Sequence, residues 1–292
     1  MTKIISGTQL AKELREEIKN EAAALREKGV EPTLAVVLVG DNKASRSYVN
    51  SKHKACIENN INSIKIELSE EISTDDLLTE IEKLNKDEKV HGILVQLPLP
   101  KHIDAEKVLN AVIPSKDVDG FHPINVGRLM LGLPCFVSAT PLGILELLQR
   151  NNIPTKGKKC VIVGRSNIVG KPLATLMMQK GYGDATVTVC HSRTANLADE
   201  CRQADILVGA MGRPEFITAE MVKEGAVVID VGTTRVKDET RKSGFRLSGD
   251  VKYDEVAPKC EWITPVPGGV GPMTICMLML NTLAAGKHTY YK

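Results

Sequence analysis

The chain has 292 residues, a formal net charge of +2 and 25% charged residues. That length is sufficient for two domains with large hydrophobic cores, and so balanced a charge argues against a nucleic-acid-binding protein. No apolar run approaches membrane-spanning length, and the N-terminal segment is charged and amphipathic, unlike a secretory signal. The seven cysteines are scattered, without C-x-x-C or metal-ligand spacing. We therefore expect a cytoplasmic protein with reduced thiols and no metal, which binds neither nucleic acid nor membrane.

Strands and helices alternate in the first half of the chain. Apolar periodicity predicts helices over residues 8–28, 45–59 and 74–85 and strands over residues 33–40, 63–68 and 92–97. Because strands and helices follow one another in turn, this order predicts a parallel sheet covered on both faces by helices.

A second series of elements follows residue 140. It consists of helices over residues 141–150, 171–180 and 196–203 and strands over residues 159–164, 186–190, 205–210 and 226–232. The apolar helix from Met273 onwards is long enough to need a second surface to cover, so we expect it to return to the first domain. The predicted domains are residues 1–140 with 273–292, and residues 141–272.

A glycine turn follows the strand at residues 159–164. The segment GRSNIVGKP (164–172) leads into a helix, which is the arrangement that places a pyrophosphate on a helix N-terminus. It departs from the G-x-G-x-x-G pattern, because Ser166 and Val169 stand where the second and third glycines would be. The context of strand, turn and helix nevertheless favours a dinucleotide site.

The next strand ends in CHSRT (190–194), without the acidic residue that usually binds the ribose hydroxyls of NAD. Arg165, Ser192 and Arg193 instead offer cationic and hydroxyl donors that suit a 2′-phosphate. The alternative is that both arginines are solvated loop residues. Beside the glycine turn, we favour NADP as the cofactor.

A stiff segment lies near the C-terminus. Two prolines and three glycines within residues 265–271 argue against a regular helix or central strand there. Glycines allow a ligand to approach the backbone, and the following helix would direct its positive end at that ligand. The alternative is a rigid turn between domains.

Several polar residues of the first domain are candidates for catalysis. Tyr48 and Lys52 are four residues apart and share a face if that segment is helical, where desolvation can lower the pKa of the lysine. Gln96 ends a buried strand, where open α/β sheets bind ligands. Asp117 and Asp119 form an acidic loop, and a carboxylate there can accept paired N–H donors from a heterocycle. The alternatives are a surface lysine and turn aspartates.

Six motifs occur in order along the chain. They are YVNSK (48–52), VQLPLP (95–100), KDVDG (116–120), VGRSNIVGKP (163–172), CHSRT (190–194) and PVPGGVGPMT (265–274). Together they resemble the bifunctional methylenetetrahydrofolate dehydrogenase/methenyltetrahydrofolate cyclohydrolase family over nearly the whole chain. One departure is Ala139, where many relatives have cysteine, and we expect little consequence from it.

The resemblance implies two α/β domains, each with a mostly parallel sheet flanked by helices, the second being a Rossmann-like NADP-binding domain. It implies NADP-dependent oxidation of 5,10-methylenetetrahydrofolate to 5,10-methenyltetrahydrofolate, and hydrolysis of that product to 10-formyltetrahydrofolate in one-carbon metabolism. It also implies a homodimer.

The resemblance further implies roles for single residues. Lys52 would be the general acid–base group, Gln96 would hold its amine, Tyr48 would orient substrate and water, and Asp119 would bind the pterin. The implied folate-binding residues are Tyr48, Val49, Asn50, Ser51, Lys52, Val95, Gln96, Leu97, Asp119, Pro267, Gly268, Gly269, Val270 and Gly271. The implied NADP-binding residues are Gly164, Arg165, Ser166, Ser192, Arg193, Thr233 and Thr274.

Two rival functions remain open from the sequence. A different NADP oxidoreductase, such as a shikimate-dehydrogenase-like enzyme, could share the two-domain plan, since fold does not determine function. A non-enzymatic nucleotide-binding regulator would bind NADP tightly without turnover. An absorbance change with methylenetetrahydrofolate and NADP would separate these alternatives from the folate enzyme.

Overall fold

The computed structural model describes residues 1–241 and 244–291. The chain divides into two compact units. The six-stranded unit comprises residues 1–12 and 140–274, and the three-stranded unit comprises residues 13–139 and 275–292. Among the described residues, no helix is both long enough and apolar enough to cross a membrane.

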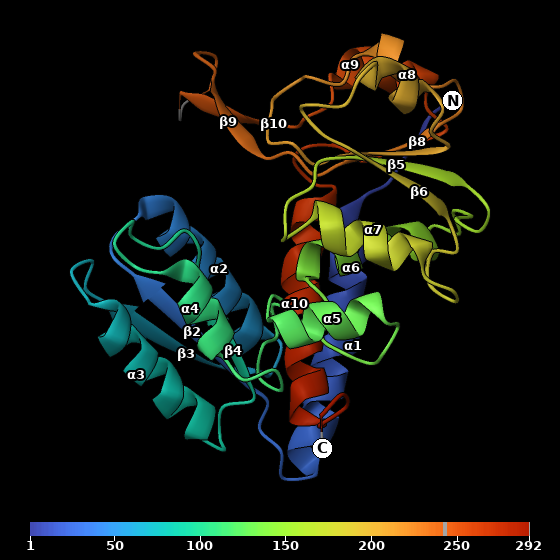
Figure 1. The fold of residues 1–292 in the computed structure, drawn as a ribbon. Helices are drawn as coiled ribbons and strands as arrows, with labels where there is room; N and C mark the ends of the chain where they lie inside the picture. The colour runs from blue at the N-terminus through green and yellow to red at the C-terminus, as the bar shows by residue number, and fades with distance from the viewer. Residues whose placement is uncertain (242–243, 292) are drawn as a thin grey trace. The chain divides into compact units, whose positions relative to one another are not determined.

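The six-stranded unit is built on one parallel sheet (Figure 1). Its order is β1-β11-β8-β7-β5-β6, and every pair of neighbours is parallel. The strands are β1 (Lys3–Ile4), β5 (Lys159–Val163), β6 (Thr186–Cys190), β7 (Ile206–Gly209), β8 (Val227–Asp230) and β11 (Trp262–Ile263). The central strands β7 and β8 are buried along their whole length, as continuous apolar runs in a covered parallel sheet should be.

Helices and a separate hairpin complete this unit. They are α6 (Ala139–Arg150), α7 (Gly170–Met178), α8 (Leu197–Arg202), α9 (Tyr253–Val256), the 3₁₀ turns η1 (Ala219–Met221) and η2 (Ala257–Lys259), and the antiparallel pair β9 (Thr234–Lys237) and β10 (Phe245–Ser248). Apolar side chains from β5, β7, β8 and α9, among them Val161, Leu207, Val228 and Val256, form one core beneath the sheet.

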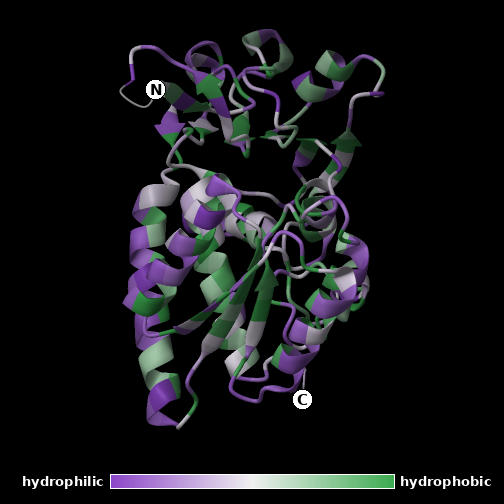
Figure 2. Ribbon diagram, turned by 90° about the vertical axis from the view of Figure 1, so that its left-hand side faces the viewer, coloured by the Kyte–Doolittle hydropathy of each residue, from purple (hydrophilic) through white to green (hydrophobic). Residues whose placement is uncertain are grey.

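The three-stranded unit has a parallel sheet of order β3-β2-β4. Its elements are β2 (Thr33–Val39), α2 (Lys43–Glu58), β3 (Asn62–Leu68), α3 (Thr74–Lys86), β4 (Gly92–Val95), α4 (Ala105–Ala111) and α5 (Pro123–Met130). Strands β2 and β4 are largely hydrophobic, whereas β3 and the helices mix polar and apolar residues (Figure 2). A core of β2 and β4 side chains with Leu77 and Ile81 of α3 stabilises the unit.

Two long helices belong partly to each unit. Helices α1 (Gly7–Glu27) and α10 (Val270–Gly286) begin in the six-stranded unit and continue in the three-stranded unit. In the latter they run side by side (Figure 1), where the Lys287 ammonium pairs with the Glu21 carboxylate and Arg15 is hydrogen-bonded with the Cys276 thiol.

Three of the boundaries that differ from those predicted affect residues of the candidate site or the division into units. Residues 1–12 belong with the second half of the chain, because β1 pairs with β11, and a two-residue strand leaves no periodicity to recognise. Helix α10 begins at Val270 rather than Met273, since Pro272 is compatible with a first helical turn, whose N–H groups have no intrahelical acceptors. Strand β4 ends at Val95, so Gln96 follows it.

Candidate active site

The carboxyl ends of the parallel strands place several loops at one edge of the six-stranded sheet. The chain order reverses beside β5, because β6 lies on one side of it and β7, β8 and β11 lie on the other. Ligands of open α/β sheets bind at such a switch point, outside the carboxyl ends of the strands. Here the switch point lies between the turn that follows β5 and the loop that follows β7.

The turn after β5 requires glycine at two positions. Gly164 has a φ of +141°, and a Cβ on it would lie 2.2 Å from the Ala210 carbonyl oxygen. A Cβ on Gly170 would lie 2.1 Å from the Gly164 carbonyl oxygen. Gly170, and not residue 169, therefore provides the close approach of helix to turn, so the motif is one residue longer than the pattern assumed.

Ser166 closes the same turn. Its Oγ accepts hydrogen bonds from the backbone N–H of Val169 at 3.1 Å and of Gly170 at 3.4 Å, at the start of α7. It therefore satisfies N–H groups that a helix start leaves without intrahelical partners. A bare glycine backbone beside a helix N-terminus fits the diphosphate of a dinucleotide.

Two cations and a hydroxyl lie close to the carboxyl ends of β5 and β6. Arg165, Ser192 and Arg193 are exposed, and neither guanidinium has a hydrogen bond or ion pair with the rest of the described chain. The β6 loop is ordered, because His191 N–H donates to Thr194 Oγ1 at 2.9 Å. Such unpaired guanidinium groups are available for a phosphate monoester, which they bind through charge-assisted hydrogen bonds.

The proline–glycine segment is fastened to the start of α1. Thr8 N–H donates to the Gly268 carbonyl at 3.0 Å, and Gly268 has a φ of +104°. A Cβ on Gly269 would lie 2.6 Å from the Pro265 carbonyl, so this glycine faces its own loop. Nothing lies within 4 Å of a Cβ built on Gly271. The segment is therefore a stiff turn that still presents open space at its helical end.

The remaining predicted residues of this unit differ in exposure. Pro267 and Thr233 are exposed, whereas Val270 is buried. Thr274 Oγ1 donates to the Gly271 carbonyl at 2.8 Å. A ligand at this edge can therefore meet Pro267 and Thr233, while the Val270 side chain serves the core.

In the three-stranded unit, α2 presents a polar group toward the carboxyl end of β4. Asn42 caps the helix, its Oδ1 accepting from Ala44 N–H at 3.0 Å and Ser45 N–H at 3.1 Å. Lys52 Nζ donates to Gln96 Oε1 at 3.1 Å, and Gln96 Nε2 donates to the Leu97 carbonyl at 2.7 Å. The amide of Gln96 is thus oriented by backbone and in turn orients the amine.

Burial changes the protonation of this group. Desolvation lowers the pKa of Lys52, against the opposing influence of the Asp119 carboxylate. Desolvation likewise raises the pKa of Asp119, against the opposing influence of Lys52. Burial raises the pKa of the Cys56 thiol, which lies one turn after Lys52, to about 12, so this thiol is uncharged at physiological pH. The lowered pKa allows the Lys52 amine to exchange its proton at a pH closer to neutral.

The loop that carries Asp119 is held by buried polar groups. Asp117 accepts hydrogen bonds from His122 N–H at 2.8 Å and Asn125 Nδ2 at 2.9 Å, so it is the turn aspartate of the alternative interpretation. Burial raises its pKa to about 7. Asn281 of α10 donates to the carbonyls of Val118 at 2.8 Å and Val137 at 2.9 Å. Sequence reasoning missed Asn281, although a lone amide within an apolar helix was a signal.

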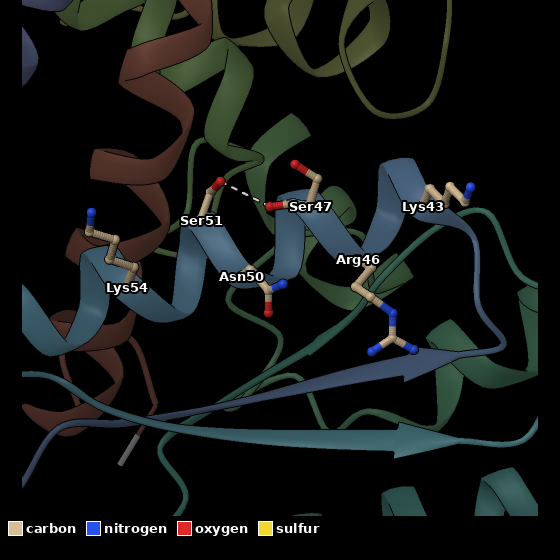
Figure 3. A pocket seen from close by; sticks show the side chains of 6 residues that line it. All are labelled: Lys43, Arg46, Ser47, Asn50, Ser51 and Lys54. Carbon is tan, nitrogen blue, oxygen red and sulfur yellow. Dashed lines mark hydrogen bonds between the residues drawn. The ribbon is translucent and has the colours of Figure 1, made fainter.

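The opposite face of α2 lines a pocket of about 450 Å³ (Figure 3). It is lined by Lys43, Arg46, Ser47, Asn50, Ser51 and Lys54. Helical spacing of 100° per residue places Asn50 about 200° around the axis from Lys52. The Arg46 guanidinium is engaged by Asp41 at 2.7 Å and Glu67 at 2.6 Å. The chemistry therefore points to the Lys52 face, and Asn50 and Ser51 lie away from it.

Two other predicted folate-binding residues are core residues. Val49 is 1% exposed and Val95 is 3% exposed, whereas Tyr48 is 56% exposed. The Tyr48 hydroxyl makes no hydrogen bond within residues 1–241 and 244–291. Within those same residues, no group of three or more His, Cys, Asp or Glu side chains could hold a metal ion.

Comparison with known proteins covers the whole chain. Residues 5–119 match the model of the tetrahydrofolate dehydrogenase/cyclohydrolase catalytic domain, and residues 138–290 match that of the NAD(P)-binding domain. The chain is 60% identical to the bifunctional protein FolD of Phocaeicola vulgatus, over 99% of each chain.

Two solved structures are similar throughout. The FolD methylenetetrahydrofolate dehydrogenase/cyclohydrolase of Campylobacter jejuni is 49% identical with a TM-score of 0.94, covering 99% of this chain and 100% of that one. The methylenetetrahydrofolate dehydrogenase-cyclohydrolase (FolD) of Trypanosoma brucei, complexed with NADP cofactor and inhibitor, is 41% identical with a TM-score of 0.93, covering 99% and 98%.

Proposed function

This chain belongs to the tetrahydrofolate dehydrogenase/cyclohydrolase family, and from that premise we propose which residues bind the substrate, bind the cofactor and transfer protons. The enzyme oxidises 5,10-methylenetetrahydrofolate with NADP and hydrolyses the 5,10-methenyl product to 10-formyltetrahydrofolate. Family membership sets aside the shikimate-dehydrogenase-like and non-enzymatic alternatives. The folate chemistry is assigned to the three-stranded unit, which holds Lys52, Gln96 and Asp119, and NADP binding is assigned to the six-stranded unit, which holds the glycine turn.

Lys52 is the acid–base group of the hydrolysis, and its 3.1 Å hydrogen bond to Gln96 is the observation that carries this role. The methenyl carbon is already electrophilic, so the protein has to position it, activate water and move protons. Water adds to that carbon while the amine of Lys52 accepts the proton. Lys52 then returns this proton to the departing nitrogen as the carbon–nitrogen bond breaks. The remaining hydroxyl proton is released to solvent as the C=O bond forms, leaving the formyl group on the other nitrogen.

Tyr48 and Asp119 hold the substrate in this proposal. The Tyr48 hydroxyl is exposed one turn before Lys52, where it can orient substrate and water. The Asp119 carboxylate accepts hydrogen bonds from the paired N–H donors of the pterin. These hydrogen bonds stabilise the ionised form of Asp119, which burial otherwise disfavours. Gln96 keeps the Lys52 amine in place between them. Pro267, Gly268, Gly269, Val270 and Gly271 belong to the six-stranded unit, and their folate-binding role stays a prediction of the sequence.

NADP bound here would supply the acceptor for the hydride of the methylene carbon. The residues at the carboxyl edge of the six-stranded sheet fit it: Gly164 and Ser166 suit the diphosphate, and Arg165, Ser192 and Arg193 suit the 2′-phosphate. Thr233 and Thr274 are assigned to the nicotinamide side. The protein's contribution to this step is positioning.

We also propose that the enzyme is a cytoplasmic homodimer. Support comes from the β9–β10 hairpin, on which Phe245 is 49% exposed and Leu247 is 39% exposed, as expected of an association surface. Light scattering should give about twice the chain mass of 31.8 kDa. A monomeric mass at micromolar concentration would rule out the dimer.

Lys52→Met tests the catalytic assignment, because it removes the amine and keeps most of the bulk. The rate of methenyltetrahydrofolate hydrolysis should fall about 10²- to 10⁴-fold, the usual contribution of a general acid–base group. Folate and NADP should still bind. Lys54→Met is the matched control, since Lys54 lies on the other face of α2 and should leave the rate near that of the wild type. Undiminished hydrolysis by Lys52→Met would refute the role.

A further inference from the structure

Asp250 is a buried carboxylate in which only one of the two oxygens accepts hydrogen bonds from the described part of the chain. It is fully buried, and its Oδ2 accepts hydrogen bonds from Met211 N–H at 2.5 Å and Gly212 N–H at 3.0 Å. Its Oδ1 is also buried and has no hydrogen-bond partner among the described residues. Burying a polar atom without a hydrogen-bond partner is unfavourable, so the structural contribution of Asp250 comes from Oδ2 and its two N–H donors rather than from Oδ1.

The backbone that Asp250 binds forms one wall of the glycine turn. Ala210 directly follows β7, and its N–H donates to the Val163 carbonyl at 2.9 Å. The Ala210 carbonyl is the group against which Gly164 packs, leaving no room for a Cβ. Any displacement of Met211 and Gly212 is therefore transmitted to the turn at the switch point of the sheet.

A second buried carboxylate holds Asp250 itself. Asp230 ends β8 and accepts hydrogen bonds from the N–H groups of Gly232 at 2.9 Å, Asp250 at 2.8 Å and Val251 at 2.9 Å. A Cβ on Gly232 would lie 2.3 Å from the Asp250 nitrogen, and a Cβ on Gly249 would lie 1.9 Å from Asp230 Oδ2. The two carboxylates thus join the loops after β7 and β8 through segment 249–251.

We propose that Asp250 is a positioning residue of the NADP site, which fixes the Met211–Gly212 backbone against Gly164 in the conformation that accepts the dinucleotide. This inference rests on the proposed location of NADP at the glycine turn. It assigns Asp250 to the dehydrogenase rather than to hydrolysis, since the acid–base group of hydrolysis is Lys52 in the other unit. The pair of N–H donors needs an oxygen acceptor at this position, and the second oxygen is dispensable.

Two variants distinguish the loss of the hydrogen-bond acceptor of Asp250 from the loss of its ionisable group. Asp250→Ala removes the acceptor, while Asp250→Asn keeps one oxygen that can receive both N–H groups. We expect Asp250→Ala to raise the dissociation constant of NADPH, followed by its fluorescence, at least tenfold and to raise the KM for NADP. Asp250→Asn should stay within about threefold of the wild type. Hydrolysis of methenyltetrahydrofolate, which consumes no NADP, should change much less than NADPH binding.

A stability-matched control excludes a general loss of structure. Val256→Ala creates a cavity in the core of the same unit and removes none of the hydrogen bonds of Asp250, and it is measured by thermal unfolding alongside Asp250→Ala. If NADPH affinity falls equally in both variants, or if Asp250→Ala binds NADPH normally, the positioning role is wrong. Failure of the proposed function would look different, because the wild-type enzyme itself would then not bind NADPH.

Discussion

The candidate sites of the two units consist of different kinds of chemical group. In the three-stranded unit the reactive groups are side chains whose protonation is altered by burial, with the pKa of Lys52 lowered and that of Asp119 raised. In the six-stranded unit the site consists of backbone turns and exposed guanidinium groups that are charged throughout the physiological range. Proton transfer needs groups that change charge, whereas holding a phosphorylated cofactor needs groups that do not.

The largest of the three effects that test this contrast is expected at Arg165. Arg165→Ala should weaken NADP binding by about 10- to 150-fold, because losing a charge-assisted hydrogen bond costs about 1.5–3 kcal/mol. NAD, which lacks the 2′-phosphate, should be bound as before. KM values for both cofactors provide the measurement, and Arg202→Ala on α8 is a surface arginine control. Equal weakening of both cofactors would mean that Arg165 supports the loop instead.

The buried carboxyls should make the stability of the protein depend on pH, and Asp117→Asn isolates the contribution of one of them. The pKa of Asp117 is raised to about 7 from an ordinary 3.8, so its contribution is fully present below pH 3.8 and is lost as pH rises through 7. Between pH 5 and pH 8 the wild type should lose about 3 kcal/mol more unfolding free energy than the variant.

Urea unfolding of both proteins at the two pH values measures this difference. The amide that replaces the Asp117 carboxylate can still accept the stronger hydrogen bonds from His122 and Asn125, so the comparison isolates the charge. Parallel pH dependence in the two proteins would show that Asp117 titrates like an exposed aspartate.

The smallest effect is a displacement of the pH profile of hydrolysis. The Asp119 carboxylate raises the pKa of Lys52, so Asp119→Asn should lower it further and move the corresponding limb of the kcat profile to lower pH. Saturating substrate separates this effect from weaker folate binding. Glu58→Gln, which changes a charge paired with Lys54, is the control. If that limb of the kcat profile lies at the same pH in Asp119→Asn as in the wild type, the Asp119 carboxylate does not influence the pKa of Lys52.

Local patterns predicted much of the fold and part of the site. Runs of buried apolar residues identified β2, β5 and β8, and the family motifs, found in sequence order, led to the confirmed family, activities and cofactor. The roles assigned to Lys52, Gln96 and Asp119 remain predictions. The helical face of Lys52 was predictable too. The folate-binding role of Asn50 stays a prediction, and Asn50 lies on another face of α2.

The sequence by itself determined the longer strands and helices, because periodicity and glycine placement are local properties, but it did not indicate β1, α4, α5, β9 or β10. Only the tertiary structure decided that β1 joins β11, that Gly170 approaches Gly164, and that the pKa of Lys52 is lowered. It also brought Asp250 to residues 211–212 and Asn281 to Val118. Strand pairing, desolvation and buried hydrogen bonds depend on groups that are distant along the chain, so no local pattern encodes them.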